Sequence, residues 1–200
     1  MRMTGRIVIV ATLVLLVGFS AAAQEKWPSR TITIVGGFPT GAGTDIYSRM
    51  LAEPLSKALG VSVIVDNKSG AGGNVGSEFV ARARPDGYTL YFGTAGTHAI
   101  NVTLYGKLPF DVIKDFSHIS ILGDVPNIMI VNPKIMPNVN SCADVMKLAK
   151  EKPGELKYAS TGNGASTHLA GAIFTKMSGL QIDHIPYRGT PPGHERHDVG

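Results

Sequence analysis

The stretch Ile32–Asp45 constrains the fold most, because a short apolar run there breaks abruptly into a glycine-rich turn. Residues 31–35 alternate threonine with isoleucine and valine as a short strand does, and four glycines and a proline follow. The pair Thr44-Asp45 predicts a helix cap. A strand that leads through such a turn into a helix gathers backbone N–H groups and the positive end of a helix dipole around one point. This arrangement favours an anionic ligand.

The same order of strand, small-residue loop and helix recurs along the chain. We expect loops at 70–74, 93–97 and 160–167, each rich in glycine, serine, threonine or asparagine. The strands before and after them are predicted at 61–65, 88–92, 156–159 and 182–186, and the helices at 45–59, 75–83, 98–104 and 168–178. Right-handed crossovers between such units make a parallel sheet, and ligands then bind beyond the carboxyl ends of its strands. The predicted fold class is α/β.

The middle of the chain is less regular. Residues 119–122 and 128–131 are apolar runs that predict two further short strands. Ser141 and Asp144 match a capping box, which predicts a helix to about Glu151. Cys142 is the only cysteine, so no disulfide forms within the chain, and its apolar neighbours favour a small core residue.

The first 23 residues have the pattern of an export signal. Arg2 and Arg6 precede an apolar run that is shorter than the roughly 20 residues of a membrane span, and small residues precede Gln24. We therefore expect cleavage after Ala23, in preference to an uncleaved anchor. Loss of the two arginines lowers the formal charge from +4 to +2, which is too weak to favour nucleic acid as a partner.

The last ten residues differ from the rest. Residues 191–200 contain one aliphatic side chain and two histidines, where a strand and loop of this type are followed by an apolar helix. Our hypothesis is that the sequence is truncated or shifted in frame near Thr190.

No motif for catalysis, a cofactor or a metal is found in the sequence. The third glycine of a dinucleotide fingerprint falls on Ile46, no phosphate loop occurs, and the six histidines are scattered. Ser166 and His168 have poor spacing for a catalytic pair. Asp45 is interpreted as a helix cap in preference to a general base. Arg188 is either a surface charge or a partner of a bound anion. The expected protein is therefore not an enzyme.

Seven stretches together resemble one family, the periplasmic solute-binding receptors of tripartite tricarboxylate transporters, often called Bug receptors. They run in family order and are Trp27–Arg30, Phe38–Asp45, Asn67–Asn74, Pro85–Leu90, Gly93–Asn101, Ala159–Gly164 and Pro186–Gly189.

The resemblance implies a type II periplasmic binding protein with two lobes, whose glycine-rich strand-to-helix loops face a cleft. The expected division is a signal peptide (1–23), a first lobe (24–126), part of a second lobe (127–190) and an aberrant tail (191–200). Without the remaining part of the family's fold, the second lobe would be incomplete and apolar faces would be exposed.

In the family, loop amides, hydroxyls and waters hold a small carboxylate. The ligand-binding residues that the resemblance implies are Phe38, Gly41, Ala42, Thr44, Asp45, Gly72, Gly73, Asn74, Thr94, Gly96, Thr97, Thr161, Asn163, Ser166, His168, Tyr187 and Arg188. The expected protein is a periplasmic monomer that delivers its ligand to membrane permease subunits, without a cofactor or metal. Two alternatives stay open: a ligand-sensing subunit of a membrane signalling system, and a hydrolase of small anionic substrates.

Overall fold

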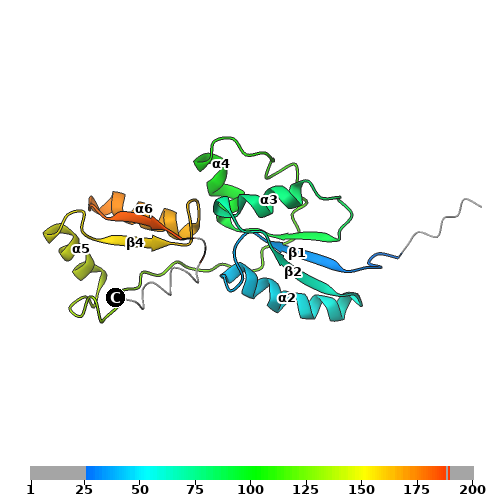
Figure 1. The fold of residues 1–200 in the computed structure, drawn as a ribbon, viewed down its shortest axis with the longest axis horizontal. Helices are drawn as coiled ribbons and strands as arrows, with labels where there is room; N and C mark the ends of the chain where they lie inside the picture. Colours follow the sequence, from blue (N-terminus) through cyan, green and yellow to red (C-terminus); the bar gives the residue numbers. More distant parts are fainter. Residues whose placement is uncertain (1–25, 188, 190–200) are drawn as a thin grey trace, which may run out of the picture.

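The computed structural model describes residues 26–187 and Gly189, which form two parallel sheets flanked by helices (Figure 1). The first sheet has the order β2-β1-β3, with β1 at Ile32–Gly36, β2 at Val63–Asn67 and β3 at Thr89–Phe92. The second consists of β4 (Lys157–Ser160) and β5 (Asp183–Pro186). All strand pairs are parallel, which confirms the α/β prediction.

Helices follow the strands in the predicted order. The first sheet carries α2 (Gly43–Leu59), η2 (Ala71–Gly73), α3 (Asn74–Ala81), η3 (Gly96–Ile100) and α4 (Asn101–Leu104). The second carries α5 (Cys142–Glu151) and α6 (Ser166–Ser178). Helix α2 ends at Gly60, whose φ of 71° is left-handed and suits glycine. Helices α2, α3, η3 and α6, which follow the loops after β1, β2, β3 and β4, begin one or two residues before the predicted start, because these loops are shorter than expected.

The core of the larger half lies around the central strand. Ile32, Ile34 and Val35 of β1 are at most 3% exposed, because β1 has a neighbouring strand on each side. In the smaller half Val145, Ala149, Ala165 and Leu180 are buried.

Two predicted strands are wrong. Residues 119–122 and 128–131 pair with no other strand in the described part of the chain, and they belong to an irregular connection between the halves (Figure 1). Ile121 is 90% exposed and Ile128 is 80% exposed. An apolar pattern alone makes no strand, because a strand requires a neighbouring backbone to pair with.

The start of α5 confirms one prediction and corrects another. Ser141 Oγ accepts a hydrogen bond from the backbone N–H of Asp144, and Asp144 accepts one from the N–H of Asn140. The helix therefore starts where the capping pattern predicts. Cys142 is exposed, so its assignment to the core is wrong. Cys142 shares a face of α5 with Val145 and Ala149, but only those two are buried, so that face is covered further along the helix and not at its first residue.

Some predictions fall outside the described residues. These are the signal peptide with its cleavage site, Arg188 and the tail at 191–200. The boundary between lobes near residue 126 stays a prediction, although the two sheets lie on either side of it. Among the described helices none has the length and apolar character needed to cross a membrane.

Candidate functional site

The loops after β1, β2 and β3 meet at Gly73. Because the three strands are parallel, their loops leave the same edge of the sheet. A Cβ atom at Gly73 would lie 2.5 Å from the methyl group of Thr97 and 3.2 Å from the ring of Phe38. Gly73 also has a φ of 93°, which favours glycine. The structure thus brings the first three predicted loops together.

The loop after β4 packs against these loops from the other half of the molecule. The hydroxyl of Tyr105 donates to the carbonyl of Asn163 at 3.3 Å. A Cβ at Gly96 would lie 2.8 Å from the carbonyl oxygen of Gly164. Near the end of the described chain, Gly189 lies against the ring of Pro39. Loops from both sheets therefore converge, as the sequence predicts.

Three helices that start from these loops have no side chain as a cap. The N-cap residues of α2, α3 and α6 are Ala42, Gly73 and Ala165. Ala42 and Ala165 have nearly the same backbone angles, with ψ of 159° and 156°. By contrast Ser141 caps α5, which does not start from a converging loop. At α2 and α6 the first N–H groups remain available to an anion, whereas at α3 the N–H of Asn74 donates to Ala71 O and that of Val75 to Gly70 O.

The predicted cap of α2 is corrected by this geometry. The helix begins at Gly43, ahead of the Thr44-Asp45 pair, and so neither residue is its N-cap. The hydroxyl oxygen of Thr44 is buried and has no hydrogen-bond partner among the described residues.

Asp45 is 2% exposed, and its buried carboxylate is hydrogen-bonded within the protein. Its carboxylate accepts hydrogen bonds from Gly41 N at 2.8 Å, Arg49 Nε at 2.9 Å and Asn67 Nδ2 at 2.5 Å. Burial raises the pKa of Asp45, but the bonds from Arg49, Gly41 and Asn67 outweigh burial and hold the pKa below its ordinary value. This carboxylate fixes the loop after β1.

The loops after β2 and β3 also contain side chains that bond within the protein. Asn74 is buried, and its Oδ1 accepts from Asn101 Nδ2 at 2.7 Å. Thr97 is buried, and its hydroxyl accepts from the N–H of Thr94 at 3.0 Å. Asn101 was missed as a site residue, although it lies within a stretch that resembles the family. The signal in the sequence that could have identified Asn101 was a polar residue within a predicted helix.

The loop after β4 repeats this threonine arrangement. Thr167 accepts from the N–H of Thr161 at 3.0 Å. Ser166 donates to Asn127 at 3.3 Å, whereas His168 Nδ1 accepts from Gly164 N at 3.2 Å, so Ser166 and His168 do not form a pair. The N–H of Tyr187 donates to Ser160 O and extends the pairing of β5 with β4.

A serine and a histidine distant in sequence lie side by side in the second sheet. Ser160 Oγ is 2.7 Å from His184 Nε2, and the His184 ring stacks on His168 with centroids 4.1 Å apart. Burial, followed by the nearby His168, lowers the pKa of His184. Ser160 is only 5% exposed and accepts the N–H of Gly162, so the pair supports the loop.

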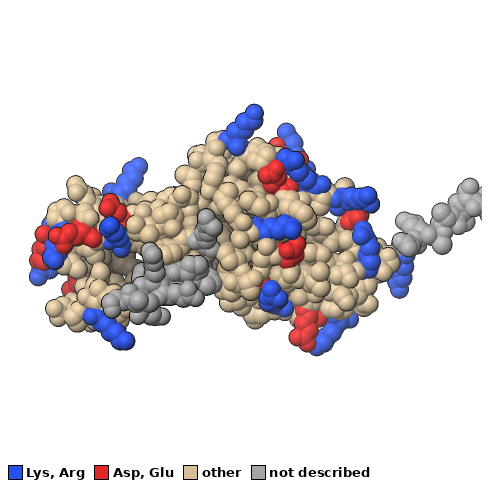
Figure 2. Space-filling view, viewed as in Figure 1, with Lys and Arg blue, Asp and Glu red and all other residues tan. Residues whose placement is uncertain are grey.

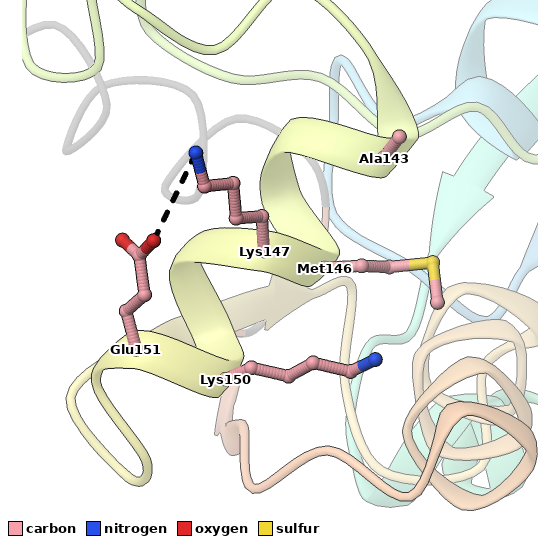
Figure 3. A pocket seen from close by; sticks show the side chains of 5 residues that line it. All are labelled: Ala143, Met146, Lys147, Lys150 and Glu151. Atoms are coloured by element: carbon pink, nitrogen blue, oxygen red, sulfur yellow. Dashed lines mark ion pairs between the residues drawn. The ribbon is translucent and has the colours of Figure 1, made fainter.

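Two hollows of the surface lie away from the converging loops. One, of about 460 Å³, runs along α5, where Met146 and the paired side chains of Lys147 and Glu151 line it (Figure 3). The other, of about 490 Å³, lies between α6 and the second sheet beside Tyr158 and His184. Neither hollow is lined by a predicted site residue.

Figure 2 shows basic and acidic side chains interspersed over one face, without a large patch of either sign. In the part of the chain that the structure describes, no three His, Cys, Asp or Glu residues are placed to hold a metal ion.

Comparisons with known proteins place this geometry in a family. The sequence pattern of the family described as "Tripartite tricarboxylate transporter family receptor" matches residues 47–196. BugT of Bordetella pertussis is 32% identical over 194 residues, which cover 96% of this chain and 59% of BugT.

Solved structures agree. Rpa4515 of R. palustris, solved with adipate, has a TM-score of 0.83 at 36% identity over 87% of this chain and 57% of that one. MatC (Rpa3494) of Rhodopseudomonas palustris, with bound malate, has a TM-score of 0.79 at 28% identity over 87% and 58%. The chain thus spans less than two thirds of the length of these relatives. These matches confirm the resemblance seen in the sequence: the chain belongs to the receptor family of tripartite tricarboxylate transporters.

Proposed function

We propose that this protein is an extracytoplasmic receptor that binds a small carboxylate between the converging loops of its two sheets. The observation that carries the proposal is the pair of uncapped helix starts at Ala42 and Ala165, one from each sheet, beside the carboxyl ends of parallel strands. Backbone N–H groups in this arrangement stabilise a carboxylate without a basic side chain.

The related structures support the class of ligand. Rpa4515 was solved with adipate and MatC with malate, and both ligands are small dicarboxylates. A dicarboxylate has two anionic ends, which suits helix starts contributed by two sheets. We infer that the remaining predicted residues, including Tyr187 and Arg188, line the same space.

Membership of the family supports a transport role. We infer that the first 23 residues direct export and are cleaved after Ala23, and that the mature chain acts as a monomer in the periplasm. Its partners would be the permease subunits of a tripartite transporter, which receive the ligand when the lobes open. The lobe boundary near residue 126 is the expected site of that movement.

Calorimetric titration with adipate and malate tests the proposal, with adipamide as a matched ligand that has no negative charge. We expect either acid to bind and adipamide not to bind. Thr44→Val removes the buried unpaired hydroxyl and is expected to weaken binding about tenfold, because a lost hydrogen bond costs roughly 1.4 kcal/mol.

Thr103→Val is the matched control, because Thr103 is exposed on α4. Equal affinity of adipamide and adipate would contradict the proposal. Absence of binding by a panel of mono-, di- and tricarboxylates would also contradict it.

A further inference from the structure

Asn101 connects three of the converging loops. It is fully buried at the start of α4, directly after η3. Its Nδ2 atom donates to the carbonyl of Gly72 at 3.0 Å and to Asn74 Oδ1 at 2.7 Å. Both hydrogens of one carboxamide therefore hold the loop after β2.

The oxygen of this carboxamide lies against the loop after β4. Asn101 Oδ1 is buried and has no hydrogen-bond partner among the described residues. A Cβ atom at Gly164 would collide with this oxygen and would lie 3.1 Å from the carbon that bears it. Gly164 has a φ of 84°, so both its conformation and the adjacent oxygen favour glycine there.

The contact continues on both sides of Asn101. A Cβ at Gly72 would collide with the carbonyl of Asn163, and it would lie 3.1 Å from the hydroxyl of Tyr105, which bonds to that carbonyl. A Cβ atom added at Gly164 would also lie 3.3 Å from the side chain of Leu104. One turn of helix α4 thus touches the loop after β2 and the loop after β4.

A buried oxygen without a hydrogen-bond partner lowers the stability of the fold, typically by about 1–3 kcal/mol, so the orientation of this carboxamide needs an explanation. The opposite orientation of the carboxamide would place its oxygen against two acceptors, Gly72 O and Asn74 Oδ1. The hydrogen bonds to the loop after β2 therefore force Oδ1 toward Gly164.

We propose that Asn101 is a positioning residue that sets the spacing between the loop after β2 and the start of α6, on which the proposed carboxylate binding rests. It anchors the loop after β2 by two donated bonds and limits how closely Gly164 approaches. A substitution of Asn101 then alters both loops together, although the side chain of Asn101 itself contacts no ligand.

Asn101→Asp tests the proposal because it keeps the shape and removes both donors. In the full chain we expect amide hydrogen exchange to rise about tenfold in 72–74 and also in 163–164, with the rest of the chain unchanged. Adipate or malate, whichever the wild type binds, should bind at least tenfold more weakly at pH 7.5. The loss should diminish toward pH 5, because a protonated carboxyl regains one donor.

Asn138→Asp is the control, because Asn138 is exposed and lies outside the converging loops. It should change neither exchange nor affinity. If Asn101→Asp fails to fold by circular dichroism, Gly164→Ala disturbs the same contact from the other side. Faster exchange at both 72–74 and 163–164 in that variant would support the coupling.

Exchange that rises in one loop alone would overturn the role of Asn101, as would an unchanged, pH-independent affinity in Asn101→Asp. If the wild type binds neither acid nor any other carboxylate, the proposed function fails. The exchange comparison still decides whether Asn101 couples the two loops, because it requires no ligand.

Discussion

The side-chain amide of Asn67, at the end of β2, donates to the carboxylate of Asp45 in the first turn of α2 at 2.5 Å. This bond joins a strand to a helix that lies 22 residues earlier in the chain. Gly41 and Arg49 donate to the same buried carboxylate. The loop after β1 is therefore fixed by contacts with an ionised side chain, in addition to its own backbone turns.

Asp45→Asn should lower the free energy of unfolding by roughly 1–3 kcal/mol. The carboxylate of Asp45 accepts hydrogen bonds from three donors, whereas the carboxamide of asparagine has one acceptor oxygen and an NH₂ group that cannot accept. Urea denaturation followed by circular dichroism measures the change. Glu53→Gln is the matched control. Glu53 pairs with Lys57 but both are at least 73% exposed, so its effect should stay within about 0.5 kcal/mol.

The same variant has a predictable acid dependence. The folded chain holds the pKa of Asp45 below its ordinary value of 3.8, so the carboxylate stabilises the fold above that pH. This contribution is lost as the pH falls through the folded pKa, and the difference between wild type and Asp45→Asn should then shrink. A difference that stays constant from pH 7 to pH 2.5 would contradict this assignment.

Acidification from pH 7.5 to pH 5.5 should lower the melting temperature of the wild type through His184. Burial and then His168 lower the pKa of His184 from its ordinary value of 6.5. Between the folded pKa and 6.5 the unfolded chain binds more protons, so stability falls as the pH falls.

His184→Gln removes this titration, and its melting temperature should depend less on pH over the same range. Scanning calorimetry of both proteins measures the two slopes. Glu53→Gln is the control, since Glu53 is exposed on α2 and pairs with Lys57 on the same helix. Equal slopes in wild type and His184→Gln would show that another group governs the acid response.

Gly76→Ala should destabilise the chain by about 1–3 kcal/mol, because the added Cβ would lie 2.9 Å from the Cα atom of Gly37. Helix α3 packs there directly on the loop after β1. Gly43→Ala, at the start of α2, meets no atom within 4 Å and should be neutral or stabilising by up to about 1 kcal/mol. Urea unfolding distinguishes the two, and equal effects would contradict the close packing at Gly76.

Ile121→Lys should leave the free energy of unfolding within about 0.5 kcal/mol of the wild type, because Ile121 is 90% exposed. It should reduce self-association at high concentration, since several exposed isoleucines lie in the same irregular connection. Analytical ultracentrifugation measures the association. Ile34→Lys is the contrasting change, because Ile34 is 3% exposed and its replacement should unfold the sheet.

The predictions from sequence succeeded where a few neighbouring residues decide the outcome. Gly60 ends α2 because a left-handed residue stops a helix locally. Ser141 starts α5 through a bond to a residue three positions away. Alternating residues in β1 and repeated glycine-rich loops were enough to predict a parallel sheet with loops at one edge.

The tertiary structure decided which polar side chains serve the protein itself. Asp45 and Asn74 belong to loops with the pattern of a ligand site, yet their oxygens bond to Asn67 and Asn101, which lie 22 and 27 residues away. It also left residues 119–131 without a strand partner and Cys142 exposed. Sequence patterns record local preference, whereas burial and hydrogen-bond partners depend on which distant segments meet when the sheets assemble.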